Sequence, residues 1–187
     1  MLERAAGLPD VGQLRDDLEI LAAHHRPVGS QGEADAVRYL RDRFEEMGYS
    51  VTLQPYTDGQ GRTGHNVAAV KAASVPDADI LVLSAHHDSV PTAYGANDNA
   101  SGVAALLYTA EALRNVPTDT EVRFLSFTDE ENGKNGSRTY TASLTEEERT
   151  RIVGAIQFDM LGGLGSTGTL VCTVDGEANW VSDLLQK

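Results

Sequence analysis

The sequence predicts an α/β protein: a three-layer sandwich whose mixed sheet, parallel at its centre, is flanked by helices. Two observations predict this class. Apolar runs typical of buried strands alternate with helical segments in the second half of the chain, and two strand-like segments joined by a turn precede them. A chain of 187 residues suits one compact unit, so residues 1–187 are expected to form a single domain.

Two helices are expected first. From Pro9 onward, apolar residues recur at helical spacing, and Asp10 is placed to cap them. In the second helix Ser30 and Glu33 form a capping box, and Gly48 is placed to end it. The apolar face of this second helix consists of Val37, Leu40, Phe44 and Met47.

A β-hairpin is expected next, because apolar and polar residues alternate over 49–54, a turn-rich stretch follows, and a second strand covers 65–71. Further strands are expected over residues 80–85, 121–127, 152–158 and 169–174, and helices over residues 100–113, 144–151 and 177–187. The apolar run 80–85 should be a central strand covered on both faces, and 152–158 another buried strand. Such a sheet binds its ligands beyond the carboxyl ends of its parallel strands.

Composition excludes several classes of function. The 28 acidic and 15 basic residues leave a net charge of −13, which argues against a nucleic-acid partner. No stretch approaches the roughly 18 apolar residues that a membrane span requires. The single cysteine, Cys172, excludes an internal disulfide and a thiolate metal site. Residues 1–4 lack the pattern of a secretory leader, and the sequence leaves open whether the protein is secreted or cytoplasmic.

Polar residues follow the predicted strands at four places: residues 86–89, 95–102 and 129–133, and Asp159. Residues two apart in an extended stretch share a face, so Asp88 can orient the imidazole of His86. Each place alone has an ordinary explanation, such as a solvated loop, a wet charge run, or a helix cap in the case of Asp98. Together they fall on one rim of a parallel sheet and can converge. Mixed imidazole and carboxylate ligation suits zinc or its close neighbours, and a carboxylate can bridge two ions about 3.5–4 Å apart.

The same residues resemble the M28 family of co-catalytic zinc peptidases. The matching motifs are His86-His87-Asp88-Ser89, Gly95-Ala96-Asn97-Asp98-Asn99-Ala100-Ser101-Gly102, Glu130-Glu131-Asn132-Gly133 with Gly136-Ser137, and Phe158-Asp159-Met160. Their order and spacing also match, and the resemblance covers roughly residue 18 to the end of the chain, including the stretch 26–29. It implies the zinc-exopeptidase type of sandwich and a peptide substrate.

The resemblance also implies roles for single residues. Asp98 would bridge two zinc ions. His86 and Asp159 would complete the ligand set of the first ion, and Glu131 would bind the second. Glu130 would be the general base, and Asp88 would be the partner that orients His86. The residue at position 87 varies in the family, so His87 is left out of the ligand set.

One departure from the family is expected to matter. The family supplies a further histidine for the second zinc from a downstream loop, and this chain ends at Lys187 before it. The other histidines, His24, His25 and His65, lie upstream and are interpreted as structural or surface residues. The second zinc site and the C-terminal part of the sheet are therefore expected to be incomplete.

Three functions remain open at this point. An exopeptidase, and most of all an aminopeptidase, is favoured, because clustered carboxylates attract a free α-ammonium group, whereas a carboxypeptidase would favour an Arg or Lys that is not found. A non-catalytic scaffold with the same fold is the second, although such a domain has no need of Glu130. A glutaminyl cyclase ranks lowest, because those relatives typically carry Ser after the bridging Asp, where this chain has Asn99.

Overall fold

The structure is a computed structural model that describes residues 9–163, 171–173 and 176–186. Its helices are α1 (Val11–Leu21), α2 (Gln31–Glu46), α3 (Ser101–Leu113), α4 (Asn135–Ser143), α5 (Glu146–Arg151) and α6 (Trp180–Leu185), with one π-helical turn, η1 (Ala96–Ala100), before α3. Its strands are β1 (Ser50–Thr57), β2 (Thr63–Lys71), β3 (Ile80–His86), β4 (Glu121–Phe127) and β5 (Ile152–Gln157). No helix among these is long and apolar enough to cross a membrane.

The five strands form one mixed sheet in the order β1-β2-β4-β3-β5, which confirms the expected fold class. Strand β3 is parallel to both of its neighbours, β4 and β5, whereas β2 is antiparallel to β1 and β4. In β3, Ser84 lies opposite Leu125 on one side and Gln157 on the other. The carboxyl ends of the three parallel strands therefore lie level at one edge of the sheet.

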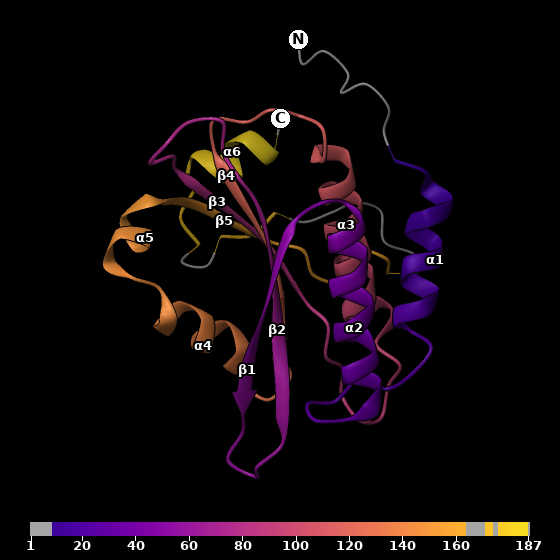
Figure 1. The fold of residues 1–187 in the computed structure, drawn as a ribbon. Helices are drawn as coiled ribbons and strands as arrows, with labels where there is room; N and C mark the ends of the chain where they lie inside the picture. Colours follow the sequence, from indigo (N-terminus) through magenta and orange to yellow (C-terminus); the bar gives the residue numbers. More distant parts are fainter. Residues whose placement is uncertain (1–8, 164–170, 174–175, 187) are drawn as a thin grey trace.

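Helices cover both faces of the sheet, so the molecule has three layers (Figure 1). Helices α1, α2 and α3 lie on one face, where Leu40, Phe44 and Leu107 pack against Phe124 in the larger apolar cluster. Helices α4 and α5 lie on the other face, over a smaller cluster that includes Phe127. Leu40, Phe44, Leu107 and Phe124 are 0% exposed, and full burial of such a side chain stabilises the fold by about 1.5–3 kcal/mol.

Local capping explains where the first two helices begin. The carboxylate of Asp10 accepts a hydrogen bond from the backbone N–H of Gly12, and the hydroxyl of Ser30 accepts one from Glu33. The expected capping box is only half formed, because the carboxylate of Glu33 does not return to the N–H of Ser30. That N–H donates to the carbonyl of Pro27, and Glu33 instead accepts from Gly29 and from the hydroxyl of Thr128.

The end of the chain departs from expectation in three places. Strand β5 was expected to be buried, but it is an edge strand in the described sheet, and Val153 is 40% exposed. The last helix begins at Trp180, three residues later than expected, with Asn179 as its cap. Half of the strand expected over 169–174 falls outside the described residues, and its described part, residues 171–173, is neither helix nor strand. Earlier in the chain, helix α4 was not predicted from the sequence.

Candidate metal centre

The candidate site lies at the edge where the parallel strands end. His86 is the last residue of β3, and Asp98 belongs to the turn η1 that leads into α3. Glu130 and Glu131 follow β4, and Asp159 follows β5, in each case within four residues of the strand end. Because the three strands are parallel and level, their following loops meet at the same edge. Residues far apart in the chain are thereby placed side by side.

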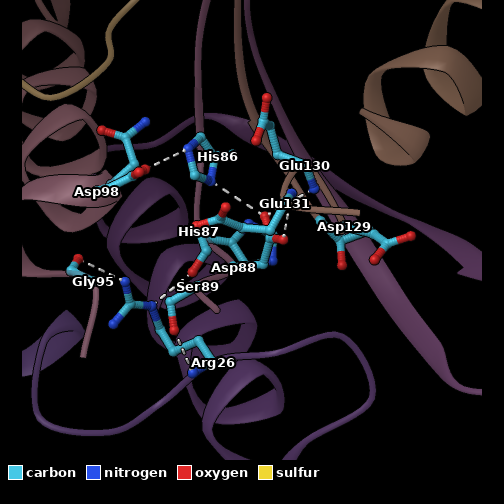
Figure 2. A network of polar contacts seen from close by, with 12 residues as sticks. Arg26, His86, His87, Asp88, Ser89, Gly95, Asp98, Asp129, Glu130 and Glu131 are labelled. Carbon is cyan, nitrogen blue, oxygen red and sulfur yellow. Dashed lines mark hydrogen bonds and ion pairs between the residues drawn. The ribbon is translucent and has the colours of Figure 1, made fainter. Parts of the chain in front are cut away.

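Three of the four expected metal ligands lie within mutual reach. His86 Nε2 is 3.1 Å from Asp98 Oδ1 and 3.8 Å from Asp159 Oδ1, and one ligand atom from each residue lies within 4.8 Å of the others. The imidazole is 1% exposed, whereas the two carboxylates are 46% and 42% exposed, so the group opens to solvent on its carboxylate side. Figure 2 shows Asp98 facing the ring of His86.

This group fits a zinc ion in both chemistry and spacing. One imidazole nitrogen and two carboxylate oxygens are ligands that zinc takes in proteins, and ligand atoms around a tetrahedral zinc lie about 3.3 Å apart. The distances from His86 Nε2 to Asp98 and Asp159 bracket that spacing. It is the one such group among the described residues. The arrangement can therefore hold a divalent cation with three protein ligands.

Glu131, the fourth expected ligand, is not a member of this group. Its carboxyl is nevertheless close enough for the site's charges to act on it: burial raises the pKa of Glu131, and the negative charge of Asp98 raises it further. Burial also raises the pKa of Asp159; the positive charge of His86 opposes this rise, and the negative charge of Asp98 adds to it. The carboxylates repel one another, and a bound cation would relieve this repulsion.

Asp88 is buried behind the site and connects two of its parts. Its Oδ1 lies 3.3 Å from His86 Nδ1, and its two oxygens accept hydrogen bonds from the backbone N–H groups of Glu130 (3.1 Å) and Glu131 (3.2 Å). Burial opposes the negative charge of Asp88, but the two histidines and the amide of Glu130 outweigh it and hold its pKa below the usual range. Asp88 therefore stays ionised, and it fixes the histidine relative to the pair of glutamates (Figure 2).

His86 is strongly polarised by these neighbours. Burial alone would lower the pKa of its imidazole, but the carboxylate of Asp88, followed by Asp159 and Glu130, raises that pKa to about 9. Without a cation the ring is therefore protonated at neutral pH. A metal ion needs the neutral ring, so binding must release this proton.

Two neighbouring residues of the expected motifs point elsewhere. His87 is 0% exposed; its Nδ1 lies 3.0 Å from the hydroxyl of Ser126, and its Nε2 lies 3.8 Å from Glu33 Oε1. Asp129, the first of the three consecutive acidic residues, is also fully buried and turns away from His86 in Figure 2. Its carboxylate accepts hydrogen bonds from the side-chain amides of Asn132, in the same loop, and Asn135, the first residue of α4. Asp129 shapes the loop that carries the glutamates.

The sequence did not reveal a role for Arg26, whose buried side chain holds together segments that adjoin the site. Arg26 is 1% exposed, and its guanidinium donates to the backbone carbonyls of His87 (2.6 Å), Tyr94 (2.7 Å) and Gly95 (3.0 Å), as well as to the end of α1. It thereby ties the segment after β3 to the loop before Asp98 (Figure 2). The only signal in the sequence was the family resemblance of the stretch 26–29, which does not reveal these partners.

Solved structures of aminopeptidases share this fold. The aminopeptidase from Aneurinibacillus sp. strain AM-1 superposes with a TM-score of 0.88 at 24% identity, over 95% of this chain and 76% of that one. A zinc aminopeptidase from Bacillus subtilis superposes equally well, also with a TM-score of 0.88 and the same coverage, at 19% identity.

The sequence then identifies the family. Residues 66–187 match peptidase family M28, and the chain belongs to it. It is 38% identical over 135 residues to aminopeptidase YwaD of Bacillus subtilis, covering 71% of this chain and 29% of that protein. It is 35% identical over 151 residues to leupeptin-inactivating enzyme 1 of Streptomyces exfoliatus, covering 78% of this chain and 34% of that protein. The chain thus spans about a third of the length of these curated relatives.

Proposed function

We propose that this chain carries the catalytic centre of a zinc-dependent aminopeptidase, which removes N-terminal residues from peptides. The observation that carries the proposal is the convergence of His86, Asp98 and Asp159 at the edge of the sheet, with Glu130 anchored beside them by Asp88. Membership of family M28 and the likeness to zinc aminopeptidases support it.

In this proposal the ligands divide between two zinc ions. His86, Asp98 and Asp159 would hold one ion, and Asp98 and Glu131 would hold the other, with Asp98 shared between the two. Zinc, when bound, acts as a Lewis acid that polarises a carbonyl and lowers the pKa of water. The pKa values of Asp159 and Glu131 are raised, first by burial and then by the negative charge of Asp98, as expected for two carboxylates that lie near Asp98.

Glu130 would be the general base. Its carboxylate oxygens would take a proton from the attacking water molecule and pass it to the nitrogen of the departing amine. The backbone N–H of Glu130 is fixed by Asp88, which also faces His86, so the base and the metal ligand share one support. Asp88 would keep the neutral imidazole in the tautomer that leaves Nε2 free for metal.

The charge of the site supports action at the amino end of a peptide. Asp98, Glu130, Glu131 and Asp159 are partly exposed or exposed, and together they create a negative field where the substrate must enter. A free α-ammonium group is attracted into such a field, whereas a terminal carboxylate is repelled. We therefore infer a requirement for an unblocked N-terminus.

Hydrolysis of an aminoacyl chromogenic substrate by the zinc-loaded chain tests the proposal, with an N-acetylated version of the substrate as the control. We expect zinc-dependent activity on the free amine and little on the blocked one. Glu130→Gln should lower kcat by about 10²–10⁴-fold, because it removes the base. Zinc content measured after dialysis should stay unchanged in this variant. Equal activity on both substrates, or a fully active Glu130→Gln, would refute the assignment.

A further inference from the structure

Asn99 follows Asp98 directly, and its side chain connects the loop of Asp98 to the loop of Asp159. It is 0% exposed. Its Nδ2 donates a hydrogen bond to the carbonyl of Phe158 (3.0 Å), and its Oδ1 accepts one from the backbone N–H of Met160 (3.3 Å). Phe158 and Met160 are the residues on either side of Asp159. One buried side chain therefore bonds the residues on both sides of Asp159, and its backbone is joined directly to Asp98.

The third hydrogen bond of Asn99 is local. Its Oδ1 also accepts from the backbone N–H of Gly102 (3.0 Å) in the first turn of α3. A cap for that helix would explain this bond, but it would not explain the two bonds that reach residues 59 and 61 positions away. A Cβ atom at Gly102 would collide with Asn99 Oδ1 and with the carbonyl of Phe158, so the glycine permits this close approach.

Neighbouring side chains extend the connection but do not replace it. The hydroxyl of Ser101 accepts from the N–H of Leu161 (3.0 Å), and Asn97 Oδ1 accepts from Gly162 (2.9 Å). Leu161 and Gly162 both follow Asp159 in the chain, so these two hydrogen bonds reach only its C-terminal flank. Within the part of the chain that the structure describes, no other side chain is seen to bond both flanks of Asp159.

We propose that Asn99 is a positioning residue that sets the separation of the Asp98 and Asp159 carboxylates around the metal ion; this inference rests on the proposed function. Metal ligands must stand within about 0.2 Å of their ideal distances. Asp98 and Asp159 sit on separate loops and are 46% and 42% exposed, so neither is held by burial. Without Asn99, binding of the metal ion would itself have to order the two loops. The entropy lost in that ordering would weaken the affinity of the site for the metal.

The test measures metal affinity rather than activity. The 187-residue chain and its Asn99→Ala variant are titrated with Co²⁺ and with Zn²⁺ in competition with a chelator, and the visible spectrum of bound Co²⁺ reports ligand geometry. Loss of a residue that positions metal ligands typically weakens binding by about 10–100-fold, and we expect a loss in that range with an altered cobalt spectrum.

Tyr49→Phe is the matched control. It removes a buried hydrogen bond to the same helix α3, from the Tyr49 hydroxyl to the carbonyl of Ala110 (2.7 Å), away from the site. We expect it to lower thermal stability but to leave metal affinity and the cobalt spectrum unchanged. If Asn99→Ala lowers stability as Tyr49→Phe does and also leaves binding unchanged, the inference is wrong and Asn99 is merely structural.

Asn99→Asp decides the case if the alanine variant does not fold. It keeps the oxygen that accepts from Gly102 and Met160, but its ionised form sets a negative oxygen against the carbonyl of Phe158. We expect weaker metal binding than in the unaltered chain, and equal binding would overturn the inference. Absence of binding by the unaltered chain would overturn the metal site itself, which is a different result.

Discussion

Asp88 lies against the side of His86 that faces away from Asp98: its Oδ1 is 3.3 Å from His86 Nδ1, and both side chains are 1% exposed. The same carboxylate accepts hydrogen bonds from the N–H groups of Glu130 and Glu131. One buried negative charge therefore orients a candidate ligand and anchors the loop of the candidate base. Its removal should affect both at once.

Asp88→Asn keeps the shape of the side chain but removes its charge and turns an NH₂ group toward one of the glutamate N–H donors. Partners that orient metal ligands typically contribute about 10–100-fold to metal affinity or activity, and we expect losses of this size in both. In the metal-free chain the pKa of His86 should fall from about 9, because the carboxylate that most raises it is gone. NMR titration of the imidazole and chelator competition measure the two effects.

The control for Asp88→Asn is Asp79→Asn, which makes the same chemical change at an exposed residue just before the opposite end of β3. It should leave the His86 pKa and the zinc affinity unchanged. A pKa of His86 that stays near 9 in Asp88→Asn would show that other carboxylates dominate.

Zinc should stabilise the fold measurably. Burial and the charge of Asp98 raise the pKa of Asp159 and Glu131, so a cation among these carboxylates removes an unfavourable repulsion. A ligand that binds only the folded state at 100 times its Kd adds about 2.7 kcal/mol to the free energy of unfolding. Melting curves recorded with zinc and with a chelator should therefore differ by several degrees.

His86→Ala checks that this stabilisation comes from the proposed site, and it should abolish the zinc-dependent shift. After dialysis we also expect one tightly held zinc rather than two, because Asp98 and Glu131 alone provide only two ligands for the second ion. Two tightly held ions would mean that another residue completes that site.

Much of the fold could be predicted because its signals are local. Periodicity and caps predicted α1 and α2, and β4 was predicted to the residue. Helix α4 was missed because Asn135–Ser143 contains few strong helix formers. It is held instead by contacts from elsewhere: the N–H of Asn135 donates to the carbonyl of Asp129, and Asn66 donates to the carbonyl of Gly136. Strand β5 was misjudged for a related reason, because an apolar run does not reveal its neighbours.

The residues of the site also fall into those that could be predicted from the sequence and those that could not. His86 and Asp159 could be proposed because they come directly after the apolar runs 80–85 and 152–158, and the parallel sheet brings these two segments together. The contacts of Asn99 and Arg26 could not, because they join residues about 60 positions apart and leave no periodic or spacing signal. Sequence patterns thus predict which side chains converge, whereas the side chains that hold them in place emerge only from the folded structure.

Arg26 should be needed for stability in a way that lysine cannot replace. Its burial lowers the pKa of the guanidinium to about 10, and its N–H groups bond backbone carbonyls from three segments of the chain. Arg26→Lys has fewer donors and leaves several buried carbonyls unpaired. We expect the free energy of unfolding to fall by about 3 kcal/mol or more, at about 1.5–3 kcal/mol for each charged hydrogen bond.

Urea unfolding measures this loss, and Arg15→Lys serves as the matched control. Arg15 is 79% exposed and pairs with Glu19 on the surface of α1. That variant should stay within about 0.5 kcal/mol of the unaltered chain. If both variants unfold alike, the carbonyl contacts of Arg26 contribute little.

Glu33 should make stability depend on pH. It is 2% exposed, and although burial opposes its charge, His87, the Thr128 hydroxyl and the N–H of Gly29 favour the ionised form and lower its pKa from the ordinary 4.5. A depressed folded-state pKa gives a stabilisation that is present above pH 4.5 and is lost as the pH falls through the folded value. Glu33→Gln should therefore lower the free energy of unfolding at pH 7 by about 1–3 kcal/mol. This difference should shrink well below pH 4.5, where the unaltered chain is protonated too. Urea unfolding at pH 7 and at a pH well below 4.5 measures this difference. Glu19→Gln is the control, because the side chain of Glu19 is 62% exposed. A difference that does not change with pH would contradict the role assigned to the charge of Glu33.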